Sequence, residues 1–583
     1  MHRKRDEIIR LLLIIAIILA VALLGSFWFF KWDLTSEKRH TLTESTQEML
    51  GQLDDEIMVR CYLHGDFPAS FKRLEQAIRE RLTEFRDYSN DQLHFEFIDP
   101  YSSNDEKTIA ETEQALYDKG LRFTRLSYTE DGAKKFKTIW PAAIVDYKGE
   151  EYPVQFFKSE MPEPTEGMIN SSVNNLEYEL ATNLRKAMKS EKAVIGILQG
   201  HGELNALEMA DFTAALEEQY AVDYVTIDGK LSALSDKLEG VPNRTNKHAA
   251  LIIAKPDSVF SWRDKTIIDQ FIMNGGKVLW LIDPLNTDLD SLRTQQQTIA
   301  TTNENGLYEV LFQYGVRLNR DLMIDPQCAV IAFDTGPMGN QRNTQLFNWY
   351  YAPVLMAPDT AHPIVANLDP IVTDFTSSLE FVGDDNTTRK TVLLRTSPLS
   401  KELKAPVRVN SAIVNFGPEY FEQGTKPNQP VAVLLEGKFS SAVQDFLPDT
   451  LKRDPVFANR TTSVNTAMIV IADGDIARNR VIQGQEGPVP VPLGYDRYAG
   501  KVIYDNKEFL LNCMNYLLDD AGLISVRSRS IELRKLNAEK IVSDKFYYQV
   551  INVVLPILLV LLLGFGGQWW RKRKWSVAGQ EKV

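Results

Sequence analysis

Five polar side chains stand directly after apolar, strand-like stretches of this 583-residue chain. His201 and Glu203 follow "AVIGILQ" in a Gly-His-Gly-Glu turn, Asp283 follows "KVLWLI", and Asp473 and Asp475 follow "AMIVIA". An imidazole and carboxylates that converge in one place can transfer protons or hold a metal ion. We therefore treat these five residues as a candidate crevice for a ligand or a partner.

The elements around these residues predict a doubly wound α/β domain. Short apolar runs alternate with helical patterns, which is typical of buried parallel strands. In such sheets ligands bind outside the carboxyl ends of the strands, where all five side chains are expected to lie. The expected strands cover 193–199, 220–227, 249–256, 277–284 and 467–475, and the helices between them include 206–220 and 262–276.

The Gly-His-Gly-Glu turn also has a structural interpretation, which the sequence favours over a catalytic one. Gly200 and Gly202 permit a tight turn, and Asn205 with Glu208 forms a capping pair for the following helix. The chain contains no G-x-S-x-G elbow, no G-x-x-x-x-G-K-[ST] loop and no H-E-x-x-H motif. We therefore expect no catalytic residue, no cofactor and no metal here.

Both ends of the chain carry uncharged stretches long enough to cross a bilayer. Residues 11–30 contain no charge over 20 positions and border on "FWFFKW", while residues 546–570 end in two tryptophans. Aromatic and basic borders of this kind are typical of a membrane interface. Basic clusters lie at 1–5 and 571–575, so the positive-inside rule places both termini in the cytoplasm and the intervening residues outside it.

The charge and the cysteines exclude two further classes. The chain carries −13, its first ten residues carry +2 and its last thirteen carry +4, so the part between them carries −19. An acidic body argues against nucleic acid as a partner. Cys61, Cys328 and Cys513 have neither C-x-x-C nor zinc spacing, so we expect no disulfide framework. Cys61 lies inside an expected strand and should be a buried, inert thiol.

A smaller α/β domain precedes the large one. Two strand patterns flank a helix in a thioredoxin-like β-α-β arrangement, which usually gives parallel strands. The segment "PEPTEG" (162–167) then separates this domain from a long helix, and 330–460 has too irregular a pattern to assign. The expected elements are strands over 56–63, 93–100, 121–128 and 142–157, the last broken by a Lys148-Gly149 turn, and helices over 69–89 and 169–190.

Seven stretches resemble, in the same order, the GldG family of gliding-motility-associated auxiliary subunits of bacterial ABC transporters. They are "KWDLTSEKRHTLT", "GILQGHGE", "VAVLLEGKFSS", "VIADGDIARNRV", "PLGYDRYAG", "DNKEFLLNCMNYLLDDAGLISVRSR" and "IELRKLN". The likeness covers nearly the whole chain. His40 departs from the family, which more often has tyrosine there.

The resemblance implies a two-pass protein in the inner membrane of a Bacteroidota-type bacterium, with a large periplasmic region. It implies a GldF-like permease and a GldA-like cytoplasmic ATPase as partners, in addition to the lipid bilayer, and a link to gliding motility and its associated secretion. It also implies that the large domain is similar to class I glutamine amidotransferases and intraflagellar-transport proteins, without the catalytic cysteine.

We therefore predict a non-catalytic auxiliary subunit that transmits conformational change to the periplasm or binds partners there. A periplasmic solute-binding receptor is the first alternative, a metal-dependent hydrolase is the second, and a second copy of the chain is an open alternative as a partner. The predicted segments are a cytoplasmic N-terminus (1–10), a first membrane helix (11–30), a periplasmic linker (31–54), a small thioredoxin-like domain (55–160), a connecting helix (161–190), a large amidotransferase-like domain (191–520), a membrane-proximal segment (521–545), a second membrane helix (546–570) and a cytoplasmic C-terminus (571–583).

Overall fold

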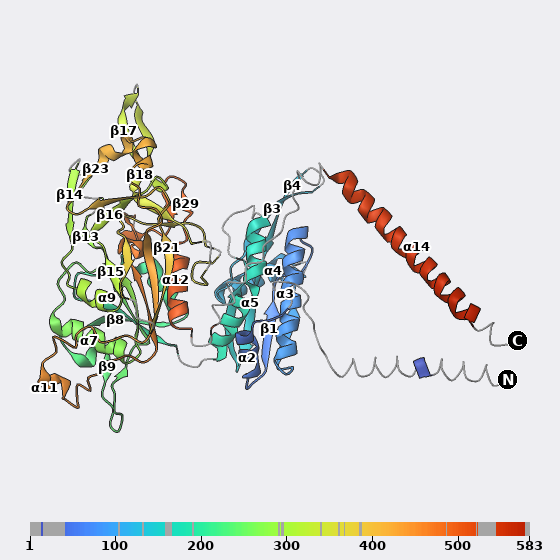
Figure 1. The fold of residues 1–583 in the computed structure, drawn as a ribbon, viewed down its shortest axis with the longest axis horizontal. Helices are drawn as coiled ribbons and strands as arrows, with labels where there is room; N and C mark the ends of the chain where they lie inside the picture. Colours follow the sequence, from blue (N-terminus) through green and yellow to red (C-terminus); the bar gives the residue numbers. More distant parts are fainter. Residues whose placement is uncertain are drawn as a thin grey trace. The chain divides into compact units, whose positions relative to one another are not determined.

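A computed structural model gives the fold of the chain, which forms two compact units, Met1–Ser530 and Ile531–Val583 (Figure 1). The predicted first membrane helix lies outside the described residues except for 13–15. The structure describes residues 13–15, 41–102, 105–130, 133–157, 166–188, 192–287, 289, 292, 297–338, 341–358, 362–366, 368–383, 387–484, 487–519, 522 and 544–577.

The first part of the larger unit contains a four-stranded sheet in the order β2-β1-β5-β6. Strands β1 (Ile57–Cys61) and β2 (Leu93–Phe97) are parallel and are joined by helix α3 (Ala69–Tyr88), which confirms the expected β-α-β unit. Strands β5 (Ala142–Tyr147) and β6 (Glu150–Gln155) form the expected hairpin, and β5 is antiparallel to β1.

One apolar face of α3 covers this sheet. Phe71, Leu74, Ile78 and Leu82 recur at helical spacing and are all buried. Cys61 is fully buried in the same core, and burial raises the pKa of its thiol to about 12. The other elements here are α2 (Glu44–Gly51), α4 (Glu106–Asp118), the hairpin β3 (Thr124–Glu130) and β4 (Ala133–Ile139), and the long helix α5 (Glu166–Met188).

A seven-stranded sheet in the order β21-β24-β25-β12-β11-β7-β8 forms the centre of the larger part. The five strands expected from the sequence are neighbours in this sheet and all run parallel to one another. They are β7 (Val194–Gln199), β8 (Ala221–Thr226), β11 (Ala250–Ala254), β12 (Lys277–Leu281) and β25 (Thr466–Ile471).

The remaining two strands come from the stretch that the sequence left unassigned. Strand β24 (Pro430–Gly437) is antiparallel to both of its neighbours, β25 and β21 (Thr388–Arg395). The sheet is therefore mixed rather than wholly parallel. The central residues of β24, "VAVLL", are fully buried, so this strand lies in the core although it runs in the opposite direction.

Helices cover both faces of this sheet. Helices α6 (Ala210–Glu217) and α12 (Asn506–Leu517) pack with one apolar cluster, and α7 (Trp262–Met273) and α9 (Tyr308–Gln313) pack with the other. The side chains of β12 alternate between the two clusters, with Leu279 in the first and Trp280 in the second. A strand buried on both faces explains its continuous apolar sequence.

Helix α6 begins later than the expected range of 206–220. The side-chain oxygen of Asn205 accepts hydrogen bonds from the backbone amides of Leu207 and Glu208, and Glu208 in turn accepts from the amide of Asn205. This capping pair was expected, but it holds residues 205–209 in a turn, so the first helical residue is Ala210.

The unassigned region also forms a separate apolar cluster around Trp349, Tyr350, Tyr351 and Phe421. A long hairpin of β17 and β18 extends from it, at the top of Figure 1. The strands around this cluster, some of which precede residue 330, include β14 (Gln297–Thr302), β16 (Asp321–Ile324), β17 (Cys328–Met338), β18 (Gln341–Leu355), β22 (Lys401–Lys404) and β23 (Val407–Asn410).

The smaller unit contains helix α14 (Lys545–Val577). Its segment Lys545–Trp570 contains an 18-residue window with a mean hydropathy of 2.5 and is long and apolar enough to cross a membrane. Within the described residues this is the one helix that meets that condition. The second predicted membrane helix is therefore a helix of suitable length and composition, and the two-pass topology stays a prediction.

Candidate functional site

The carboxyl ends of four parallel strands bring the candidate residues to one edge of the large sheet. His201 follows β7, Lys255 follows β11, Asp283 follows β12 and Asp473 follows β25. Hydrogen bonds and ion pairs group these side chains into two networks. One surrounds His201, and the other surrounds Lys255, which the sequence did not single out.

The first network encloses His201. Its Nδ1 lies 3.3 Å from Oε1 of Glu203, and its Nε2 lies 3.4 Å from Oδ2 of Asp264. The other carboxylate oxygen of Glu203 accepts a 2.6 Å hydrogen bond from the backbone amide of His201. The imidazole is stacked on the ring of Phe260 at 3.8 Å, and only 8% of His201 is exposed.

The electrostatics of this network favour a charged imidazole. Burial by itself lowers the pKa of His201. The hydrogen bonds with Glu203 and Asp264 and the negative charges of these two residues outweigh burial, so the pKa is raised above 6.5. Burial by itself raises the pKa of Asp264. Hydrogen bonds from Ser261, the amide of Gly229 and His201 outweigh burial, so the pKa lies below its ordinary value of 3.8. Ser261 caps helix α7, which fixes Asp264 in the first turn of that helix.

The second network is centred on a partly buried lysine. The Nζ atom of Lys255 lies 2.9 Å from Oδ2 of Asp283 and 2.5 Å from Oδ2 of Asp475. Asp473 is fully buried and accepts backbone hydrogen bonds from Asp374 at 3.0 Å and from Asp475 at 2.8 Å. Asp283 also accepts a hydrogen bond from the amide of Gly474. Three of the five predicted residues are thus brought together, around a lysine.

The carboxylates outnumber the lysine, and their protonation reflects this. Burial raises the pKa of Asp283 against the opposing charge of Lys255, and it raises the pKa of Asp473 well above 3.8. Nearby carboxylates add to both shifts. Burial also raises the pKa of Asp374 to about 6, against the opposing charge of Arg480. For Lys255, burial lowers the pKa, but the charges of Asp283 and Asp475 outweigh this and raise it. Lys255 is therefore a cation and not a free nucleophile.

The chain itself fills the place where doubly wound folds usually bind ligands. The strand order reverses between β7 and β11, so the binding crevice would lie outside their carboxyl ends. There the carbonyl of His201 accepts hydrogen bonds from the amides of Asp257 at 3.1 Å and Ser258 at 2.9 Å, and the amide of Leu204 donates to the carbonyl of Ala254. The two loops are therefore bonded to each other across the switch point.

Gly202 makes this close approach possible. Its φ is +75°, in the left-handed region that favours glycine, and a methyl group at this position would overlap the carboxylate of Asp257. Across the described ranges no group of three or more His, Cys, Asp or Glu residues has an arrangement suited to a metal ion. The arrangement ties four loops together at the edge of the sheet.

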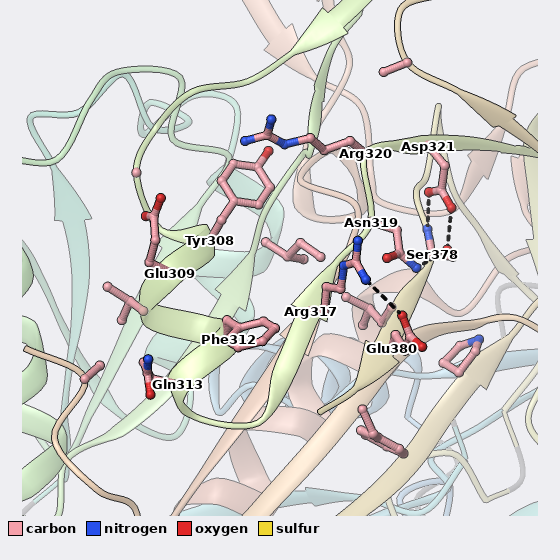
Figure 2. A pocket seen from close by; sticks show the side chains of 18 of the residues that line it. Tyr308, Glu309, Phe312, Gln313, Arg317, Asn319, Arg320, Asp321, Ser378 and Glu380 are labelled. Atoms are coloured by element: carbon pink, nitrogen blue, oxygen red, sulfur yellow. Dashed lines mark hydrogen bonds and ion pairs between the residues drawn. The ribbon is translucent and has the colours of Figure 1, made fainter. Parts of the chain in front are cut away.

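At the polar networks the structure has a small pocket of about 90 Å³, which Asp374 and Asp475 help to line. A larger groove of about 1360 Å³ lies elsewhere, beside helix α9. Helices α7 and α9, strand β15 (Val316–Leu318), strand β20 (Leu379–Phe381) and strand β22 contribute to its lining. Figure 2 shows Tyr308, Glu309 and Phe312 along one side of this groove and Arg317 and Glu380 facing each other on another. Sequence reasoning missed this groove, because an exposed phenylalanine has no signal in the sequence that separates it from a core residue.

Comparisons with known proteins place the sequence among relatives. Residues 192–513, more than half of the chain, match the family described as "ABC-type uncharacterized transport system". Residues 36–146 match a second family, described as a domain of unknown function. An uncharacterized protein of Borreliella burgdorferi is 22% identical over 98% of this chain and 100% of its own length.

Among solved structures, the "mmIFT52 N-terminal domain" covers 56% of this chain and 98% of that chain at 12% identity. The TM-score of 0.30 is too low to support a conclusion about the fold. The amidotransferase-like and thioredoxin-like descriptions of the two domains therefore stay predictions.

Proposed function

This chain belongs to the family described as an ABC-type uncharacterized transport system, as one of its auxiliary components, and we propose that it is a non-enzymatic subunit there. In this proposal the ATPase drives the permease, and the chain carries the resulting movement to its extracytosolic domains or binds a partner with them. The proposal places the protein in the inner membrane, with both termini in the cytoplasm and the large domain in the periplasm.

The observation that carries this proposal is the closed edge of the large sheet. Lys255 is held by Asp283 and Asp475, and His201 is held by Glu203 and Asp264, so these polar groups satisfy one another. A catalytic centre needs a group left free to meet a substrate. Side chains that hold four loops rigidly together suit a body that moves as a unit.

The second support is the apolar helix near the C-terminus. The segment Lys545–Trp570 exposes its side chains along the whole helix, with tryptophans at its end. In water such a surface would be unfavourable by about 25 cal/mol for each Å² of apolar area. A bilayer or the apolar helices of a permease would cover it, and either position anchors the chain beside a transporter.

We propose a GldF-like permease and a GldA-like ATPase as the partners, and a role in gliding motility and the associated secretion. The ordered resemblance to the GldG family supports both. Because the chain itself has no phosphate-binding loop of the P-loop type, a separate ATPase is needed to supply energy.

Co-purification tests this function. Affinity-tagged full-length chain is expressed with its permease and ATPase, extracted in a mild detergent and analysed for subunit composition. We expect the three subunits to elute together in a constant ratio. Recovery of the chain alone, while permease and ATPase elute together without it, would rule out the proposed assembly.

The receptor and hydrolase alternatives receive less support. Both need a solute to reach the crevice near His201 and Asp283, and the loops after β7 and β11 are hydrogen-bonded across that position. A receptor would have to use other space on the molecule.

A further inference from the structure

We infer that the groove beside α9 is a docking site for a short segment of a partner protein, one that carries large apolar side chains flanked by carboxylates. The groove lies outside both polar networks at the sheet edge. Its occupant would give the auxiliary subunit a defined binding partner, whichever permease it accompanies.

Exposed aromatic side chains gather at this groove. Among the described residues of 192–519, five tryptophan or phenylalanine side chains expose 37% or more of their surface. Four of them line the groove: Trp262 (50%), Phe312 (46%), Phe381 (37%) and Phe446 (78%). Single exposed apolar residues are normal on a protein surface, but a cluster of aromatic residues indicates an interaction site.

The floor of the groove is apolar and buried. Val310, Leu318, Leu379 and Val443 line it and are each exposed by 7% or less. An apolar side chain that entered between the exposed aromatic residues would therefore be shielded from water on all sides. Aromatic anchors around a desolvated floor, with charges at the rim, are the usual anatomy of a protein interface.

The charges at the rim determine which kind of segment fits. The exposed charged residues that line the groove are four cations, Arg317, Arg320, Lys404 and Lys426, and two carboxylates, Glu309 and Glu380. With the less exposed Lys265, Asp321 and Glu402 included, the lining holds five cations and four carboxylates, a small positive excess on a chain whose net charge is −13. A partner segment with carboxylates would be attracted to it, and a basic segment would be repelled.

The ion pairs at this rim are loose enough to be exchanged. Nη1 of Arg317 lies 3.7 Å from Oε2 of Glu380, and both side chains are about 60% exposed. Nζ of Lys426 lies 3.5 Å from Oε2 of Glu402. A partner carboxylate could take the place of Glu380 without leaving a buried charge unpaired, because both members of that pair are exposed.

The size of the groove favours a polypeptide segment over a small solute. Its volume of about 1360 Å³ exceeds the range of about 300–1,000 Å³ that is usual for small-molecule pockets. A solute would also require a few convergent polar groups, whereas this lining is apolar at the floor and charged at the rim. An extended or helical segment with two apolar anchors fits that pattern.

Selection from a displayed 12-residue peptide library tests this site. The bait is the full-length chain in lipid nanodiscs, with counter-selection against the variant that carries Phe312→Asp and Phe446→Asp. We expect enriched peptides that combine at least two large apolar residues with aspartate or glutamate. A resynthesised peptide should bind the double variant at least about tenfold more weakly than the unmodified chain.

The chain offers a matched control. Phe416 is 43% exposed but does not line the groove, so Phe416→Asp should leave peptide affinity unchanged. A second variant, Lys404→Glu with Lys426→Glu, alters only exposed rim charges and should also weaken binding of the acidic peptide. Failure to enrich any peptide over the counter-selection, enrichment of basic peptides, or equal binding to both groove variants would overturn the assignment. The selection uses no permease, so its failure is distinguishable from failure of the proposed assembly.

Discussion

The Nζ atom of Lys255 lies 2.9 Å from Oδ2 of Asp283, across the carboxyl ends of two neighbouring parallel strands. A third strand contributes Asp475, whose carboxylate is 2.5 Å from the same nitrogen. One ammonium group therefore holds together loops that are more than 200 residues apart in the sequence. This contact lies at the carboxyl ends of the parallel strands, the edge of the sheet where doubly wound folds bind ligands.

Replacement of this lysine should destabilise the protein strongly. Lys255→Met removes the cation of the partly buried Asp283 and leaves Asp475 with only Arg478, 3.4 Å away. Breaking a buried pair by removing one partner costs about 3–5 kcal/mol. Because the lysine side chain is 21% exposed, we expect a loss near 3 kcal/mol at pH 7. Thermal unfolding of the full-length chain in detergent measures it, with exposed Lys404→Met as the control. A loss of less than about 0.5 kcal/mol would mean that the lysine does not hold the loops together.

The carboxylates of this network should make stability depend on pH. The folded-state pKa of Asp374 is about 6, above its ordinary value of 3.8, so the folded state binds the proton more tightly than the unfolded state does. Its contribution to stability is therefore greatest below pH 3.8 and is lost as the pH rises through about 6.

Asp374→Asn should remove that part of the pH dependence. Relative to the variant, the unmodified chain should lose stability between about pH 4 and pH 6. The side chain of Asp374 is 30% exposed, so we expect only part of the full effect on stability. Unfolding midpoints measured across this pH range for both proteins test the prediction, and parallel curves would contradict it.

His201 should give a second pH dependence of the same sign. Its pKa is raised above 6.5 by Glu203 and Asp264, so its stabilising effect is fully present below pH 6.5 and disappears as the pH rises through the folded-state value. His201→Asn should therefore cost about 1–3 kcal/mol at pH 6 and less at pH 9. NMR titration of the imidazole, or stability measured at both pH values, can check this. A cost independent of pH would show that the ring acts only through packing on Phe260.

The close approach of the two loops can be tested at Gly202. An alanine there must adopt a φ of +75° and displace the carboxylate of Asp257, so Gly202→Ala should cost about 2 kcal/mol. Gly149 is a matched control, because its φ is +82° and no atom lies within 4 Å of an added methyl group. Gly149→Ala should cost only about 1 kcal/mol. Equal losses for the two variants would mean that the loops do not press on each other.

The sequence predicted the elements better than their long-range arrangement. The five parallel strands follow from apolar runs such as that of β12, which both faces of the sheet bury. The antiparallel direction of β24 could not be predicted, because it depends on how distant segments connect. The predicted start of α6 was wrong, because the side chain of Asn205 competes with the helix for backbone amides.

The polar site was predicted in part. Aspartates after apolar strands pointed to Asp283, Asp473 and Asp475, and the structure brings these together. A single lysine after a strand carries no comparable signal, so Lys255 was missed although it holds the network. His201 belongs to a different network, because its partner Asp264 comes from the first turn of α7.

ATP hydrolysis by the permease and ATPase, reconstituted in proteoliposomes with and without this chain, tests the central claim most directly. The account predicts that the chain alone hydrolyses no ATP and that its addition changes the turnover of the permease–ATPase pair beyond the spread of replicates. It also predicts that a chain truncated before Lys545, which lacks α14, loses this effect. Turnover that is identical with and without the full-length chain would contradict the proposed auxiliary role.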